Sequence, residues 1–102
     1  MDTLYYIVYI LICSNGAYYT GYTTDLDRRY QEHLQGTAKC KFTRSFKPLS
    51  IAQSWKIYGS KADAMKIEKY IKSLSKKDKE QLILFPEKIG VTSGIRTARN
   101  KI

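Results

Sequence analysis

A tyrosine-rich stretch near the N-terminus constrains the fold more than any other feature of the sequence. Residues 4–12 (LYYIVYILI) combine β-branched, aromatic and aliphatic side chains, which is typical of a strand that is buried on both faces. Ser14, Asn15 and Gly16 are turn-forming residues, and residues 17–23 (AYYTGYT) have the composition of a return strand. The stretch therefore predicts an antiparallel β-hairpin.

The length of the hairpin loop decides which tyrosines share a face of the sheet. Side chains alternate along a strand, so a two-residue turn would place Tyr9 and Tyr19 on opposite faces. A three-residue loop with Gly16 in the left-handed conformation instead pairs Tyr9 with Gly21. Tyr9 and Tyr19 then share a face, and Gly21 leaves space opposite Tyr9. The sequence permits both registers, and only the second builds a shared tyrosine site.

The rest of the chain predicts an α+β fold. Cap residues and apolar spacing indicate, in order, a helix over 25–34, a basic loop over 37–48, a strand over 51–58, and helices over 61–74 and 75–84. The order ββαβαα predicts a three-stranded antiparallel sheet with helices packed around it. We expect one domain over residues 1–86. Residues 87–102 are predicted to form a flexible basic tail, and the alternative is an arm that binds nucleic acid.

The charge of the chain favours a polyanionic partner. Its 102 residues include 18 Lys and Arg against nine Asp and Glu, a formal net charge of +9, and nucleic acid is the commonest partner of such a surface. No apolar run is long enough to span a membrane, and no secretory signal precedes the domain. Cys13 and Cys40 have neither a metal-binding spacing nor a disulfide pattern. We therefore expect a cytoplasmic protein with reduced thiols.

Polar residues at the edges of two predicted helices are candidates for a site. Arg29 and His33 are four residues apart and lie on one flank of their helix. Glu68 lies at the border of the apolar stripe of the later helix, where it could also pair with Lys72. Each residue alone has a structural explanation, because border arginines extend their charge to water and a single histidine is more often structural than catalytic. Their combination with two tyrosines on one sheet face favours a site.

The same residues resemble a known family. Val8-Tyr9-Ile10, then Tyr19-Thr20-Gly21, then Arg29 and His33, are similar to the GIY-YIG nuclease domain, and Ala64-x-x-x-Glu68-x-x-Ile71-Lys72 resembles the helix that carries its metal-binding glutamate. The small bacterial single-domain members, including UPF0213-like proteins, also share the Lys-Phe-Thr-Arg segment at residues 41–44. The resemblance covers residues 5–84.

The resemblance implies a metal-dependent phosphodiester hydrolase that acts on DNA, as an endonuclease or nickase of branched, damaged or single-stranded substrates. It implies that Glu68 holds one divalent cation, Mg²⁺ or Mn²⁺, and that Arg29 contacts the scissile phosphate. Tyr9 would be the general base, with its pKa lowered by a nearby cation. Tyr19 would orient water or phosphate, and His33 would relay the proton or hydrogen-bond to Tyr9.

Binding and partners are also implied. DNA is expected more than RNA, and the chain is expected to be a monomer or weak dimer with a possible protein partner. Two alternatives to a nuclease remain: a module that binds nucleic acid without cutting it, and an adaptor subunit of a larger nuclease. The predicted nucleic-acid-binding residues belong to the basic loop, and they are Lys39, Lys41, Arg44 and Lys47.

Overall fold

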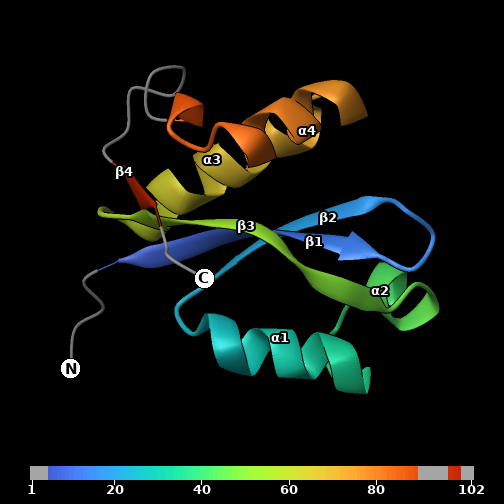
Figure 1. Ribbon diagram of the computed structural model, residues 1–102. Coiled ribbons are helices and arrows are strands. Elements are labelled where there is room, and N and C mark those ends of the chain that lie inside the picture. The colour runs from blue at the N-terminus through green and yellow to red at the C-terminus, as the bar shows by residue number, and fades with distance from the viewer. Residues whose placement is uncertain (1–4, 90–96, 100–102) are drawn as a thin grey trace.

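An antiparallel sheet with helices on both faces forms the architecture, and the predicted α+β class is confirmed (Figure 1). The computed structural model describes residues 5–89 and 97–99. The strand order is β2-β1-β3-β4, with α3 and α4 over one face and α1 and α2 over the other. The strands are β1 (Tyr6–Cys13), β2 (Tyr18–Thr23), β3 (Pro48–Ile57) and β4 (Thr97–Arg99); the helices are α1 (Leu26–Gln35), α2 (Lys41–Ser45), α3 (Lys61–Ser73) and α4 (Lys76–Leu84).

The hairpin between β1 and β2 has the three-residue loop. The backbone N–H of Cys13 donates to the carbonyl of Ala17 at 2.9 Å, and Gly16 has a φ of 82°, in the region that favours glycine. Tyr9 is therefore opposite Gly21. The second of the two registers is confirmed, and the loop places Tyr9 and Tyr19 on the same face of the sheet.

The alternation of β1 side chains divides the interior into two cores. Val8 and Ile10 point toward α3 and α4, whereas Tyr9 and Leu11 point toward α1 and α2. Among the described residues, the α3-side core is the larger and consists of nine buried residues: Val8, Ile10, Trp55, Ile57, Ala64, Ile67, Ile71, Leu82 and Ile89. In the same part of the chain the α1-side core has three buried residues, Tyr9, Leu11 and Cys13, with partly buried neighbours from α1 and α2. As predicted, β1 is buried on both faces.

Capping side chains fix the start of the two helices that border the site. The carboxylate of Asp25 accepts from the backbone N–H of Arg28, and Gly36 ends α1 with a φ of 76°. Ser60 and Asp63 form a reciprocal capping box at the start of α3. These caps fix the first turn of each helix.

The structure corrects one expectation, and it adds a short strand to the predicted three-stranded sheet and packed residues to the predicted domain. The segment predicted as a basic loop contains the short helix α2, because Phe42 packs against the α1-side core and Thr43 is buried. The sheet also has a fourth strand, β4, which pairs with β3. Ile89 is buried in the α3-side core, so the packed part of the chain extends past residue 86. The predicted flexibility of 87–102 stays a prediction, since most of that segment lies outside the described residues.

Within residues 5–89 and 97–99, no helix has the length and apolar character needed to cross a membrane.

Candidate active site

A polar pocket of about 410 Å³ lies at the edge of the sheet formed by β2. Because β2 is an edge strand, the pocket draws side chains from both faces: Tyr9 and Tyr19 from the α1 side, and Glu68 from α3. The lining residues are Tyr6, Tyr9, Tyr19, Gly21, Tyr22, Thr23, Thr24, Arg28, Arg29, Lys61 and Glu68. Four of the five predicted catalytic residues therefore converge on one concave surface.

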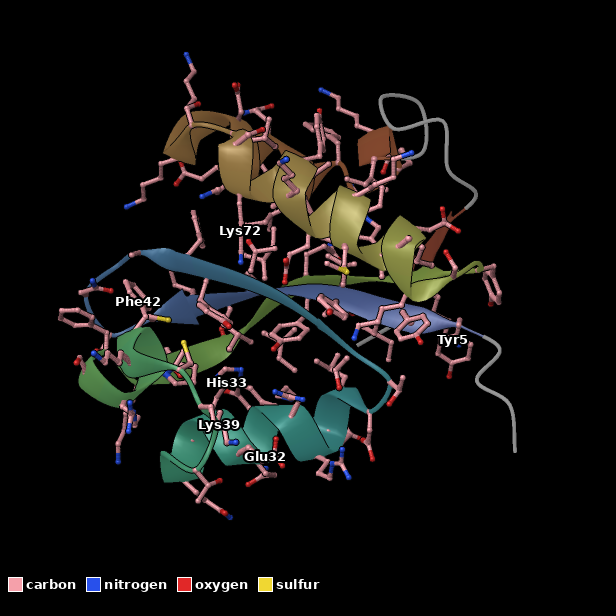
Figure 2. All side chains as sticks on the ribbon, turned by 180° about the vertical axis from the view of Figure 1, so that it is seen from behind. Tyr5, Glu32, His33, Lys39, Phe42 and Lys72 are labelled. Carbon is pink, nitrogen blue, oxygen red and sulfur yellow. The ribbon has the colours of Figure 1, made fainter. Side chains whose placement is uncertain are left out.

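The fifth predicted residue, His33, lies directly behind Tyr9. The hydroxyl oxygen of Tyr9 is 3.0 Å from Nε2 of His33, and Nδ1 of His33 is 2.8 Å from Oγ1 of Thr43. Figure 2 shows His33 between α1 and the sheet. Tyr9, His33 and Thr43 are all buried, so this chain of hydrogen bonds is shielded from water. Tyr9 meets the pocket at one end of the chain and Thr43 closes the other.

Tyr19 is held by aromatic neighbours on the same face. Its ring stacks on Phe42 with a centroid distance of 6.3 Å and an interplanar angle of 21°, and it meets the His33 ring edge-on at 5.1 Å. Burial, followed by a hydrogen bond with the thiol of Cys40, raises the pKa of Tyr19. The ring orientation is thus fixed by packing, while the phenol stays neutral.

Gly21 is the position that leaves room for the phenol of Tyr9. A Cβ atom at Gly21 would lie 2.6 Å from the hydroxyl oxygen of Tyr9 and 3.3 Å from Cε2 of Tyr19. Atoms of these types do not approach so closely without displacement, so any larger side chain would move the hydroxyl. The space predicted opposite Tyr9 is therefore filled by the functional end of that tyrosine.

Two of the charged residues of the pocket, Arg29 and Glu68, form ion pairs on their own helices. Nε of Arg29 is 3.3 Å from Oε1 of Glu32, and Nζ of Lys72 is 3.6 Å from Oε1 of Glu68. The side chain of Arg29 is 38% exposed and that of Glu68 is 19% exposed. Ion pairs between residues three or four apart on one helix are weak, about 0.3–0.5 kcal/mol at exposed sites, so both partly exposed residues can exchange these partners for a ligand. The Glu68–Lys72 contact predicted as the structural alternative is present together with the pocket.

Burial shifts the pKa values of the hydrogen-bonded pair Tyr9 and His33. Burial raises the pKa of Tyr9, the nearby Tyr19 adds to this, and the charge of Arg29 lowers it only in part. Burial and the charge of Arg29 lower the pKa of His33. The expected effect of a nearby cation is present, but desolvation is the larger effect, so the pKa of Tyr9 in the protein alone is raised and not lowered. The pair at neutral pH is a neutral phenol and a neutral imidazole.

Glu68 fits a single divalent cation that keeps most of its water. Among the residues that the structure describes, no three His, Cys, Asp or Glu side chains are grouped as a protein-only metal site. One carboxylate in an open polar pocket is nevertheless a suitable donor for Mg²⁺ or Mn²⁺, which retain several waters and take further oxygen ligands from substrate phosphate. The donor set is thus compatible with the implied cation.

The predicted nucleic-acid-binding residues are exposed but lie outside the pocket. In α2 the side chain of Thr43 turns inward, while Lys41 and Arg44 stay at the surface. These surface residues can therefore extend a binding face without contacting the reacting atoms. They are Lys39, Lys41, Arg44 and Lys47.

Several pocket residues were not among the predicted site residues. Arg28 and Lys61 add positive charge to the pocket, and Tyr6 and Tyr22 contribute two more rings from the opposite face of the sheet. Tyr6 and Tyr22 pack on the other face of the sheet, against the α3-side core, and the edge position of β2 brings them to the same pocket. Thr43 was also missed, since nothing local in a basic segment marks one threonine as buried.

The residues and their arrangement match one protein family. Residues 5–81 match the family described as "GIY-YIG catalytic domain". The chain belongs to the GIY-YIG family. This membership establishes a nuclease-type fold, and the family acts on nucleic acids.

Relatives of this GIY-YIG domain are found in bacteria and archaea. UPF0213 protein BH0048 from Halalkalibacterium halodurans is 46% identical over 76 residues, which cover 74% of this chain and 79% of that protein. UPF0213 protein VNG_2274C from Halobacterium salinarum is 45% identical over 75 residues, which cover 74% of this chain and 95% of that protein. These names state neither a substrate nor a metal.

A solved structure has the same GIY-YIG fold. The solution NMR structure of UPF0213 protein BH0048 from Bacillus halodurans is 43% identical to this chain, with a TM-score of 0.50. The match covers 79% of this chain and 84% of that one. The fold described above is therefore shared with an experimentally determined relative.

Proposed function

We propose that this protein is a divalent-metal-dependent endonuclease or nickase that hydrolyses phosphodiester bonds in DNA within the cytoplasm. One observation carries the proposal: Tyr9, Tyr19, Arg29 and Glu68, from four different elements, line a single pocket. A packing role alone would not require an arginine and a glutamate from helices on opposite faces of the sheet to meet two phenols. The net charge of +9 is consistent with a nucleic-acid substrate.

The chemistry follows from the protonation of the buried pair. A water molecule beside Tyr9 gives its proton to the phenol oxygen as the phenol proton passes to Nε2 of His33, 3.0 Å away. A low pKa of Tyr9 is then unnecessary, because Tyr9 conducts the proton and His33 accepts it. Arg29 places a planar pair of donors toward the phosphate, and Tyr19 orients the water or a phosphate oxygen.

Glu68 is the residue that would hold the metal. A divalent cation, when bound there, supplies positive charge that stabilises the leaving oxygen and the transition state. Glu68 exchanges its contact with Lys72 for that ligand, and Arg29 exchanges Glu32 for phosphate. The exposed basic residues of the 37–48 segment, which include Lys41, lie outside the pocket and would hold the DNA backbone away from the scissile bond.

The test is a cleavage assay on a panel of branched, flapped and single-stranded DNAs, with Mg²⁺, with Mn²⁺ and with chelator. We expect cleavage only with metal, a loss of at least about 100-fold in Glu68→Gln and Arg29→Lys, and unchanged DNA binding in both variants. Glu87→Gln, which changes an exposed carboxylate outside the pocket, is the matched control. Activity that survives both pocket substitutions would rule out this site.

One observation favours a second function. Arg29 and Glu68 are both engaged in ion pairs, and burial keeps Tyr9 and Tyr19 protonated, as in a fold that binds nucleic acid without cutting it. Such a binding module, or an adaptor subunit, would bind the same DNAs in a salt-dependent manner and cleave none of them with either metal.

A further inference from the structure

The buried threonine of α2 has an acceptor and a donor role that can be assigned from its neighbours. Oγ1 of Thr43 is 2.8 Å from Nδ1 of His33 and 3.5 Å from the carbonyl oxygen of Cys40. A carbonyl can only accept, so the hydroxyl proton of Thr43 points to Cys40. The lone pair of Oγ1 is then directed at His33, where it accepts a proton from Nδ1.

The opposite arrangement satisfies fewer groups. If Thr43 donated to Nδ1 of His33, then Nε2 would carry the imidazole proton and donate to Tyr9. The carbonyl of Cys40 would lose the hydroxyl donor and keep only the backbone N–H of Arg44, 3.2 Å away, and the phenol proton of Tyr9 would have to leave the chain of hydrogen bonds. Thr43 is 1% exposed and His33 is 1% exposed, so water cannot compensate at this end.

We propose that Thr43 is a positioning residue that holds His33 as the Nδ1–H tautomer, leaving the Nε2 lone pair to accept the hydroxyl proton of Tyr9. The catalytic part of this inference rests on the proposed function, whereas the tautomer does not. During the transfer the O–H bond of Tyr9 breaks and an N–H bond forms at Nε2. The imidazolium keeps its Nδ1–H on Thr43, and Tyr9 takes a proton from the attacking water.

The position of Thr43 explains why the short helix α2 matters to the pocket. The ring of Phe42 stacks on Tyr19, and the next residue carries the hydroxyl that orients His33. One helical turn thus fixes the ring of one site tyrosine and the hydrogen-bonding partner of the other. The same turn leaves Lys41 and Arg44 exposed.

A spectroscopic test is direct because His33 is the only histidine in the chain. A two-bond ¹H–¹⁵N correlation spectrum of the ¹⁵N-labelled protein distinguishes the protonated ring nitrogen from the unprotonated one. We expect protonated Nδ1 and unprotonated Nε2 in the wild type and in Thr43→Ser, which keeps the hydroxyl. In Thr43→Val, which lacks it, we expect the population to move to the Nε2–H tautomer.

Cleavage kinetics then distinguish a positioning role of Thr43 from a role in folding. With a cleavable DNA, Thr43→Val should lower kcat about 10- to 100-fold with KM nearly unchanged, and Thr43→Ser should restore it. Protonated Nε2 in the wild type would overturn the proposal even if no variant folded. Protonated Nδ1 retained in Thr43→Val would also overturn it. Protonated Nδ1 in a wild type that cleaves no DNA would support the tautomer and refute only the proposed function.

Discussion

Substitution of Gly21 by alanine tests the geometry of the pocket without removing a functional group. The added Cβ atom would lie 2.6 Å from the hydroxyl oxygen of Tyr9, whereas ordinary contacts of this kind begin near 3.4 Å. The phenol must therefore move by about 1 Å, and its hydroxyl is the group that is hydrogen-bonded to His33. A displacement of this size distorts or breaks the 3.0 Å hydrogen bond.

The energetic cost can be worked from these contacts. Overpacking of a well-packed interior costs about 1–3 kcal/mol, and a lost buried hydrogen bond adds about 1 kcal/mol. Replacing glycine in a strand returns about 0.5–1 kcal/mol through the unfolded chain. We expect Gly21→Ala to lower the free energy of unfolding by about 2 kcal/mol. A 1 Å displacement of a reacting group should lower cleavage by about 100-fold.

Urea unfolding, monitored by the fluorescence of Trp55, measures the free energy of unfolding. Trp55 is a suitable probe because it is the only tryptophan in the sequence and is 1% exposed. Gly16→Ala is the matched control. It strains a backbone with a φ of 82° and costs about 1–2 kcal/mol, but its nearest neighbour is Nζ of Lys76 at 3.9 Å. The control should lose stability and keep activity at temperatures where it is folded. A Gly21→Ala protein with undiminished stability and cleavage would refute the reasoning.

Three further predictions concern metal binding, acid stability and DNA affinity. Lys72→Met should raise the affinity for Mn²⁺ about twofold, because it frees Glu68 from an ion pair of about 0.3–0.5 kcal/mol. Titration calorimetry measures this affinity, and an unchanged value would show that the ion pair does not compete with the metal. Burial and the charge of Arg29 lower the pKa of His33, so below about pH 6.5 the unfolded chain binds a proton that the folded protein does not. The free energy of unfolding must therefore decrease as the pH is lowered from 7 to 5. Urea titrations at these two pH values should show a smaller decrease in His33→Gln than in the wild type. Lys41→Ala and Arg44→Ala should each reduce the salt dependence of DNA binding by about one counterion while leaving kcat unchanged, and a loss of kcat would place these residues in the site.

Much of the fold could be predicted because local signals agreed with each other. Turn residues, strand composition and helix caps predicted both strands of the hairpin and three helices, and the structure has them within a few residues. The helix α2 could not be predicted from propensity, because a five-residue helix has little intrinsic stability and forms here through the packing of Phe42 and Thr43. The strand β4 has only three residues, and its pairing with β3 is a long-range contact with no local signal.

The part of the site that depends on strand and helix periodicity could be predicted from the sequence. Strand alternation brought Tyr9 and Tyr19 to one face once the loop length was known, and the helical repeat placed Glu68 at the border of its stripe. Periodicity assigns residues to faces, however, and the pocket crosses from one face to the other at the β2 edge. The sign of the pKa shift at Tyr9 also depended on the balance of burial against charge, which only coordinates reveal.

The division of the interior into two cores has a consequence for thermal behaviour. Glu68 is carried by the helix that covers the α3-side core, while Tyr9 and Tyr19 belong to the smaller α1-side core. The smaller core buries less apolar surface and should open at a lower temperature. Warming would then release α1, with Arg29 and His33, from the tyrosines on the sheet, while Trp55, in the larger core, still reports a native protein. Inactivation would precede melting, and cooling would reverse it.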